Sequence, residues 1–206
     1  LILEEGTPFY ELYGGENAEG KTGAGMPGLG IAGENGGRRG ILPLPSEEEE
    51  REMYEDTGTF LKERGYYRYE ISNYARPGLE CRHNIGYWER KDYAGFGLGA
   101  ASMVDNVRWK NFSDMKRYIR GNLVKKESVR EDCVRLSLQE QMEEFMFLGL
   151  RLTKGISRRK FRETFGRDVE EVYRPVMENL HRQGLLELDK GEYIRLTPYG
   201  RDVSNY

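Results

Sequence analysis

The residue pattern predicts a mixed fold, α/β in its first part and α+β overall. Residues 46–71 predict a helix followed by a strand, which is the half-unit of an α/β sheet. From residue 137 onward, three helical patterns precede a β-hairpin pattern, an order typical of winged-helix domains. The 206 residues, 37% hydrophobic and 33% charged, suit one large globular domain or two modest ones, and the change of pattern along the chain favours two. We therefore expect one domain over residues 1–120 and a helical domain with a β-hairpin over residues 121–206.

The first forty residues are predicted to hold a strand and a glycine-rich insertion. Leu1–Tyr13 begins with an apolar strand pattern and has no initiator methionine, so we expect the chain to be a portion of a longer protein. Residues 14–40 hold 11 of the 26 glycines and show no period. Gly23, Gly25, Gly28 and Gly30 are not followed by a Lys-Ser or Lys-Thr pair or by a clear helix start, as a phosphate-binding loop requires, so the segment is predicted to be a flexible insertion.

A strong helix pattern begins after this insertion. Ser46 is the predicted N-cap, and Glu49 completes a capping box. The acidic run in the first turn complements the helix macrodipole, which favours a helix start over a metal site. Gly65 is predicted to end the helix, and the alternation over residues 67–71 predicts the next strand. Further on, residues 96–101 predict a strand of small residues that a ligand or another segment can approach closely.

The second half of the chain carries most of the predicted helices. Each of them follows a polar residue that can cap its first turn. The predicted elements are helices at 111–119 (capped by Asn111 or Ser113), 137–150, 157–164 and 168–183, a hairpin of 185–188 with 193–196, and a final turn or helix from 197.

Composition and cysteine count exclude several classes of protein. The net charge of −3 excludes a uniformly basic nucleic-acid binder. Cys81 and Cys133 are too few and too far apart for a thiolate-built zinc or iron–sulfur site within this chain. Two cysteines form no disulfide framework, which favours a reducing compartment, here the cytoplasm. No apolar run approaches the ~20 residues that cross a bilayer, so no transmembrane segment is predicted.

The densest group of unusual residues lies at 70–77 and 81–88, where a predicted strand ends in polar and aromatic side chains. His83 is one of two histidines, and a neutral imidazole can coordinate zinc, copper or heme iron. Tyr87 and Trp88 would then flank a planar ring. The alternative is a loop histidine that bonds to backbone, with the two aromatic rings in the core.

The string RHNIGYW at residues 82–88 resembles the HNxxYW motif of the HemW heme chaperones. This group is a branch of the radical-SAM family of oxygen-independent coproporphyrinogen III oxidase-like proteins. One position departs from the branch, because many of its members have histidine where this chain has Ala101. Further segments similar to the family lie at residues 4–9, 69–75, 95–102 and 148–200.

The resemblance implies both a fold and a set of binding residues. Residues 1–120 would be the C-terminal part of a partial TIM-like barrel, followed by the family's C-terminal domain. Gly97 and Gly99 would let the backbone approach S-adenosylmethionine, although tight strand packing explains them equally well. The implied heme-binding residues are His83, which would ligate the heme iron, Asn84, Tyr87 and Trp88, and the implied S-adenosylmethionine residues are Gly97, Gly99 and Ala100.

The resemblance also implies cofactors and partners. The family's radical chemistry needs a CxxxCxxC loop that holds a [4Fe–4S] cluster with S-adenosylmethionine, and this chain has no such loop. We therefore expect the loop upstream, in a longer protein. The implied function is heme binding and transfer to acceptor proteins, among them membrane respiratory enzymes. The alternative is oxidative decarboxylation of coproporphyrinogen III, for which no catalytic residue is assigned.

Three other features permit a functional interpretation. Glu70 would be a polar residue of the barrel interior, with no role assigned. His181 is expected at the surface or at a helix end. A basic cluster on the helix after Ser157 suggests a nucleic-acid-binding winged helix, but the glutamates nearby favour a solvated face or one that docks on the barrel. The residues of this cluster are Arg158, Arg159, Lys160 and Arg162.

Overall fold

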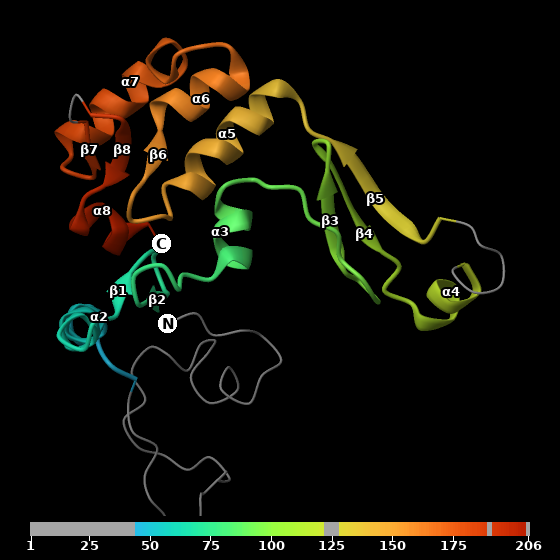
Figure 1. Ribbon diagram of the computed structural model, residues 1–206, viewed down its shortest axis with the longest axis horizontal. Coiled ribbons are helices and arrows are strands. Elements are labelled where there is room, and N and C mark those ends of the chain that lie inside the picture. Colours follow the sequence, from blue (N-terminus) through green and yellow to red (C-terminus); the bar gives the residue numbers. More distant parts are fainter. Residues whose placement is uncertain (1–43, 122–127, 189–190, 205–206) are drawn as a thin grey trace, which may run out of the picture. The chain divides into compact units, whose positions relative to one another are not determined.

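The computed structural model describes residues 44–121, 128–188 and 191–204 (Figure 1). The strand predicted in Leu1–Tyr13 and the glycine-rich segment 14–40 lie outside these residues. The chain divides into two compact units, Leu1–Thr57 and Gly58–Tyr206, so the domain boundary predicted at residue 121 remains a prediction.

Helix α2 (Glu47–Lys62) begins where the capping residues predict. The Ser46 backbone N–H donates to Glu49 Oε2 at 2.7 Å, and the Glu49 N–H donates to Ser46 Oγ at 3.3 Å, so the capping box is confirmed. These two hydrogen bonds lower the pKa of Glu49. Gly65 follows the helix in a left-handed conformation, with φ of 78°. Among the described residues, no residue of α2 is buried.

Strands β1 (Tyr67–Arg68) and β2 (Tyr74–Ala75) form an antiparallel hairpin. The strand predicted over residues 67–71 is therefore shorter, and among the described residues it pairs antiparallel. The reason is long-range pairing, because the Ile71 N–H donates to the Arg151 carbonyl and the Thr153 N–H donates to the Tyr69 carbonyl. No local pattern specifies those partners.

The middle of the chain is an antiparallel meander of β3 (Ala101–Val104), β4 (Val107–Asn111) and β5 (Arg130–Arg135). Two predictions were wrong here. The small-residue strand begins at 101 instead of 96, because Gly97 and Gly99 take positive φ values of 103° and 63°. The helix predicted from 111 begins only after β4, as α4 (Met115–Ile119), and Asp114 caps it.

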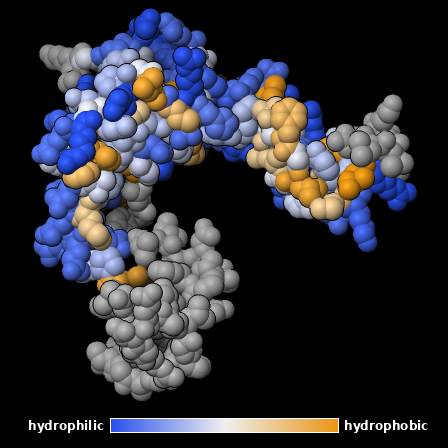
Figure 2. All heavy atoms as spheres, turned by 60° about the horizontal axis from the view of Figure 1, so that its bottom comes forward, coloured by the Kyte–Doolittle hydropathy of each residue, from blue (hydrophilic) through white to orange (hydrophobic). Residues whose placement is uncertain are grey.

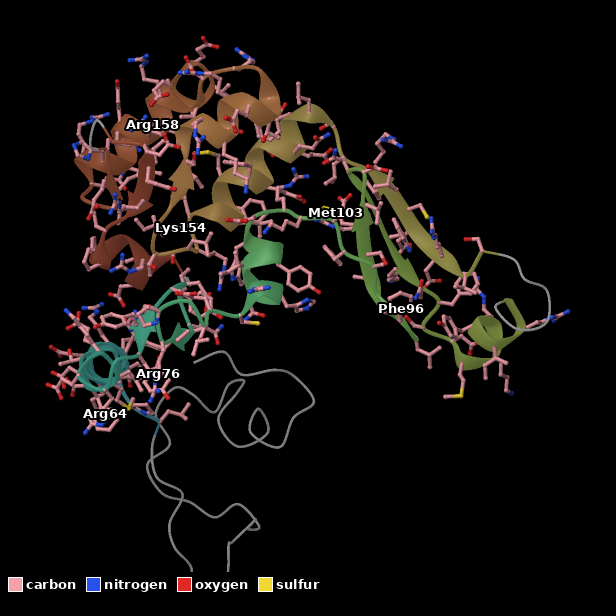
Figure 3. The ribbon with its side chains drawn as sticks, in the orientation of Figure 1. Arg64, Arg76, Phe96, Met103, Lys154 and Arg158 are labelled. Carbon is pink, nitrogen blue, oxygen red and sulfur yellow. The ribbon has the colours of Figure 1, made fainter. Side chains whose placement is uncertain are left out.

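Apolar side chains remain exposed at one end of this meander (Figure 2). Phe96 is 91% exposed, and it projects from the loop before β3 (Figure 3). Leu98, Met115 and Ile119 are also exposed.

The C-terminal part confirms the winged-helix-like order of the predicted elements. Three helices precede the predicted hairpin, and a short strand between the first two helices joins the hairpin in a three-stranded antiparallel sheet of order β6-β8-β7. Ser137, Ser157 and Thr197 each accept the capping hydrogen bond from the first turn that follows. The elements are α5 (Leu138–Gly149), β6 (Ile156–Ser157), α6 (Arg158–Phe165), α7 (Val169–Arg182), β7 (Leu186–Glu187), β8 (Tyr193–Leu196) and α8 (Pro198–Val203).

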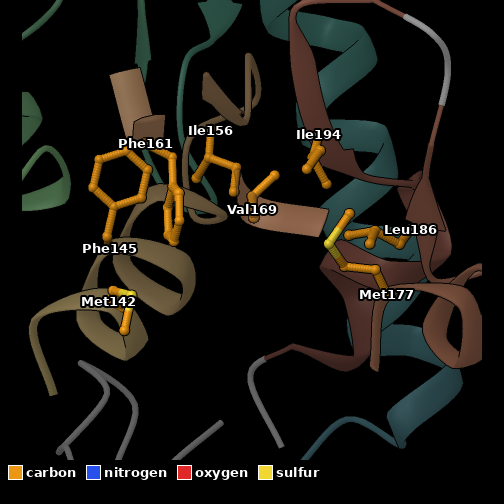
Figure 4. Close-up of a cluster of buried hydrophobic side chains, with 8 residues drawn as sticks. All are labelled: Met142, Phe145, Ile156, Phe161, Val169, Met177, Leu186 and Ile194. Carbon is orange, nitrogen blue, oxygen red and sulfur yellow. The ribbon is translucent and has the colours of Figure 1, made fainter. Parts of the chain in front are cut away.

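One hydrophobic core holds this part together (Figure 4). Phe161 is fully buried; its ring meets Phe145 edge-to-face with centroids 5.4 Å apart and lies tilted against Phe165 at 4.8 Å. Because these rings come from both α5 and α6, the core fixes the two helices against each other. The buried members are Met142, Phe145, Ile156, Phe161, Val169, Met177, Leu186 and Ile194.

Candidate functional site

The motif residues lie on a short helix, α3 (Arg82–Trp88), and not in the loop that the sequence suggested. The Ile85 N–H donates to the Cys81 carbonyl at 3.0 Å and closes the first turn. Residues four apart lie on one face of such a helix, about 40° apart, whereas residues five apart are about 140° apart. His83 and Tyr87 therefore share a face, and Trp88 points elsewhere.

His83 presents an exposed imidazole that an aromatic neighbour supports. The Tyr87 ring meets the His83 ring edge-on, with centroids 4.6 Å apart and planes at 77°. Tyr87 in turn meets Tyr93 at 4.7 Å and 75°. No hydrogen bond joins the imidazole nitrogens to another residue in the described ranges. The ring is thus held by contact with Tyr87, while its nitrogens are available to a ligand.

Trp88 packs toward the C-terminal helices. The Arg151 guanidinium lies 4.6 Å from its ring centroid, and its indole Nε1 is buried without a hydrogen-bond partner among the described residues. Trp88 lines two cavities, one of about 260 Å³ beside Glu89 and one of about 340 Å³ beside Arg151. The structure therefore brings His83 and Tyr87 together, whereas half-buried Asn84 and Trp88 lie around the rest of the helix.

A Schellman motif ends α3. The Arg90 N–H donates to the Tyr87 carbonyl at 3.0 Å, and the Lys91 N–H donates to the Gly86 carbonyl at 2.9 Å. Arg90 occupies the left-handed position of this motif with φ of 53°. Glycine is usual at this position, because a side chain there costs about 1–2 kcal/mol.

The Arg90 side chain enters a buried ionic network. Its Nε lies 3.0 Å from Glu144 Oε2, and the two side chains are only 6% and 9% exposed. Its Nη2 donates to Asn106 Oδ1 at 3.1 Å. Arg108 Nη2 reaches the other Glu144 oxygen at 2.9 Å. This arginine–glutamate network joins the end of α3 to the β3–β4 turn and to α5.

The residue before Arg90 makes a second set of ion pairs. Glu89 accepts from Lys154 at 2.9 Å and lies 3.1 Å from Lys91 and 3.4 Å from Lys160. Burial raises the pKa of Glu89, but the hydrogen bonds from Lys154 and Lys91 and the charge of Lys160 outweigh it and lower this pKa to about 2. Lys154 lies on the segment between α5 and β6 (Figure 3), so Glu89 ties α3 to the C-terminal helices.

The predicted S-adenosylmethionine residues form a separate loop before β3. Asn111 Nδ2 donates to the Gly95 and Gly97 carbonyls at 3.2 and 2.9 Å. The positive φ of Gly97 suits glycine, and a Cβ there would meet no atom within 4 Å. The space beside Gly97 is therefore open to a ligand among the described residues.

The remaining predicted residues have structural partners. Glu70 is buried and accepts from the Ser72 N–H at 2.9 Å. His181, in the last turn of α7, donates from Nδ1 to the Leu186 carbonyl at 2.8 Å. Each residue of the basic cluster on α6 meets a carboxylate, which balances its charge locally. The pairs are Arg158 with Glu170, Arg159 with Glu163 and Glu192, Lys160 with Glu89, and Arg162 with Asp168.

Sequence reasoning missed the arginine–glutamate network. Arg90, Arg108 and Glu144 belong to three elements far apart in the chain, and no motif marks them. Within the described ranges no three His, Cys, Asp or Glu residues gather as a metal site. No helix of the described part is long and apolar enough to cross a membrane.

The chain resembles known proteins over most of its length. Residues 136–203 match the family described as the HemN C-terminal domain. Two proteins named heme chaperone HemW, from Bacillus subtilis and Lactococcus lactis, are 36% and 38% identical over 168 residues. These alignments cover 82% of this chain but only 44% and 43% of the relatives. A solved structure of Escherichia coli HemN, described as coproporphyrinogen III oxidase and a radical SAM enzyme, matches 79% of this chain and 40% of its own. Its TM-score of 0.60 at 17% identity supports the fold alone.

Proposed function

The chain belongs to the HemN and HemW family, and we propose that it binds heme and passes it to acceptor proteins, with His83 as a ligand of the heme iron. The exposed imidazole of His83, held edge-on by Tyr87, is the observation that carries this proposal. A neutral imidazole nitrogen is a common iron ligand.

The geometry of α3 suits a ligand that must later be released. Tyr87 packs edge-on against the imidazole and is itself packed against Tyr93, so the two tyrosines restrict the tilt of the His83 ring. Tyr87 is itself exposed, so its ring supplies apolar surface beside the iron ligand. We assign Asn84 and Trp88 to the shape of the site. A heme held at an exposed helix remains within reach of an acceptor protein.

The cofactors of radical-SAM chemistry fit this chain only in part. A site-differentiated [4Fe–4S] cluster needs three thiolates, and Cys81 and Cys133 cannot supply them. We assign Gly97, Gly99 and Ala100 to S-adenosylmethionine, because the open space beside Gly97 permits close backbone approach. Both cysteines are free and exposed, which is consistent with a reducing cytoplasm.

Coproporphyrinogen oxidation is the second candidate function. The name of the E. coli structural neighbour supports it, whereas the names of the more similar relatives favour heme handling. Anaerobic turnover of coproporphyrinogen III by the protein with a reconstituted cluster would favour oxidation.

Hemin titration tests the heme site directly. We expect His83→Ala to weaken hemin binding at least tenfold and to shift the Soret maximum, because an axial ligand is lost. His181→Ala is the matched control, since it removes the only other histidine of the chain, and it should leave affinity and spectrum unchanged. Equal hemin binding and an identical Soret band in the protein and in His83→Ala would exclude His83 as the ligand.

A further inference from the structure

We propose that Arg90 is a positioning residue, which fixes the direction of α3 and of His83 through Glu144 of α5. This inference rests on the proposed heme site, and it gives the C-terminal helical domain a role in that site. The Arg90 side chain bonds to Glu144 and Asn106, and among the described residues it makes no hydrogen bond to His83. Its effect on heme would pass through the position of the helix.

The backbone at Arg90 indicates that its side chain is needed. Four non-glycine residues of the described part have positive φ: Arg90, Asp105, Asn106 and Asp132. Aspartate and asparagine tolerate this conformation, because their short polar side chains bond locally. Arginine has no such advantage, and glycine would suit the Schellman position better.

The contacts of Arg90 provide the reason. One guanidinium reaches Glu144 at 3.0 Å and Asn106 at 3.1 Å, so it binds α5 and the β3–β4 turn at once. Both members of the Arg90–Glu144 pair are nearly inaccessible to water, so solvent screens their attraction weakly. A buried pair of this kind specifies geometry, because no displaced arrangement satisfies both charges.

The neighbouring residue adds a second link of opposite sign. Glu89 binds Lys154 and Lys160, while Arg90 binds Glu144. Two consecutive residues of opposite charge thus contact different parts of the C-terminal domain. A one-residue shift of the chain at the end of α3 would bring either Glu89 beside Glu144 or Arg90 beside Lys154 and Lys160. The end of α3 is therefore fixed in register.

Arg90→Gly is the informative substitution, because it removes the side chain and leaves a residue suited to φ of 53°. We expect hemin affinity to fall roughly tenfold, as for outer-shell partners of metal ligands. In a His83→Ala background the same substitution should change affinity less than about twofold, since no ligand remains to be positioned. Arg90→Lys should recover part of the affinity, because it keeps the charge opposite Glu144.

Arg167→Gly is the matched control. Arg167 also pairs with a glutamate, Glu171, but both side chains are more than half exposed. This control should change neither hemin affinity nor amide exchange in α3. Amide exchange is the readout independent of heme, and Arg90→Gly should accelerate it at α3 residues.

Two results would overturn the inference. One is unchanged amide exchange in α3 of Arg90→Gly. The other is an equal loss of hemin affinity with and without His83, which would show a general structural effect. If His83→Ala alone leaves hemin binding unchanged, the heme proposal fails, while amide exchange still decides whether Arg90 positions the helix.

Discussion

Glu89→Gln should destabilise the fold in a way that depends on pH. The Glu89 carboxylate bonds three ammonium groups, and its pKa falls from 4.5 to about 2 on folding. That fall corresponds to at most about 3.4 kcal/mol. Lys154 and Lys160 are 52% and 45% exposed, so solvent screening reduces the expected loss to about 1–2 kcal/mol at pH 7.

The sign follows from the lowered pKa. Because the folded state holds the Glu89 proton less tightly than the unfolded state does, the stabilisation is fully present above pH 4.5. It decreases as the pH falls from 4.5 toward 2, and about 60% of it should remain at pH 3.5. Urea denaturation of the protein and of Glu89→Gln at pH 7, 5 and 3.5 measures this difference.

The control for Glu89 is an exposed glutamate. Glu171→Gln removes the charge that faces Arg167 at 3.7 Å at the surface, and it should cost less than about 0.5 kcal/mol at every pH. A Glu89→Gln loss that matches this control at pH 7, or that is constant down to pH 3.5, would refute the argument.

Two further predictions concern the C-terminal domain, both measured by thermal and urea unfolding. Phe161→Ala should lower the free energy of unfolding by about 3–5 kcal/mol, because the ring is fully buried. Phe96→Ala should lower it little, because Phe96 is 91% exposed. Equal losses in the two variants would contradict the assigned core. Gly155→Ala should be more destabilising than Gly78→Ala, although the two glycines have similar φ values. At Gly155 the new Cβ would lie 2.0 Å from the Ile194 carbonyl oxygen, whereas at Gly78 it would meet no atom within 4 Å. Equal losses at the two glycines would indicate that φ alone matters.

Local signals predicted several helix boundaries well. Ser46 and Ser137 each begin a helix with a complete capping box, and Gly166 ends α6 in a left-handed conformation. Each of these signals lies within a few residues of the element it specifies. These helix starts and ends could therefore be predicted from sequence.

The meander was missed although part of its signal was local. Asp105 and Asn106 both take positive φ in a two-residue turn between β3 and β4, and Asp and Asn are favoured in such turns. The third strand, β5, carries no comparable signal. None of its side chains is fully buried, and a long segment separates it from β4. Its place in the sheet depends on backbone pairing with residues about twenty positions away.

The motif names candidate residues on α3 but does not predict how they are arranged. Because the spacing of His83 and Tyr87 fits a helix as well as a loop, only the structure shows that their rings touch. The contacts that fix this helix come from Lys154 and Glu144, more than fifty residues later in the chain. The seven-residue motif therefore does not describe the site completely, because Glu144 and Lys154, which lie outside the motif, hold the end of α3.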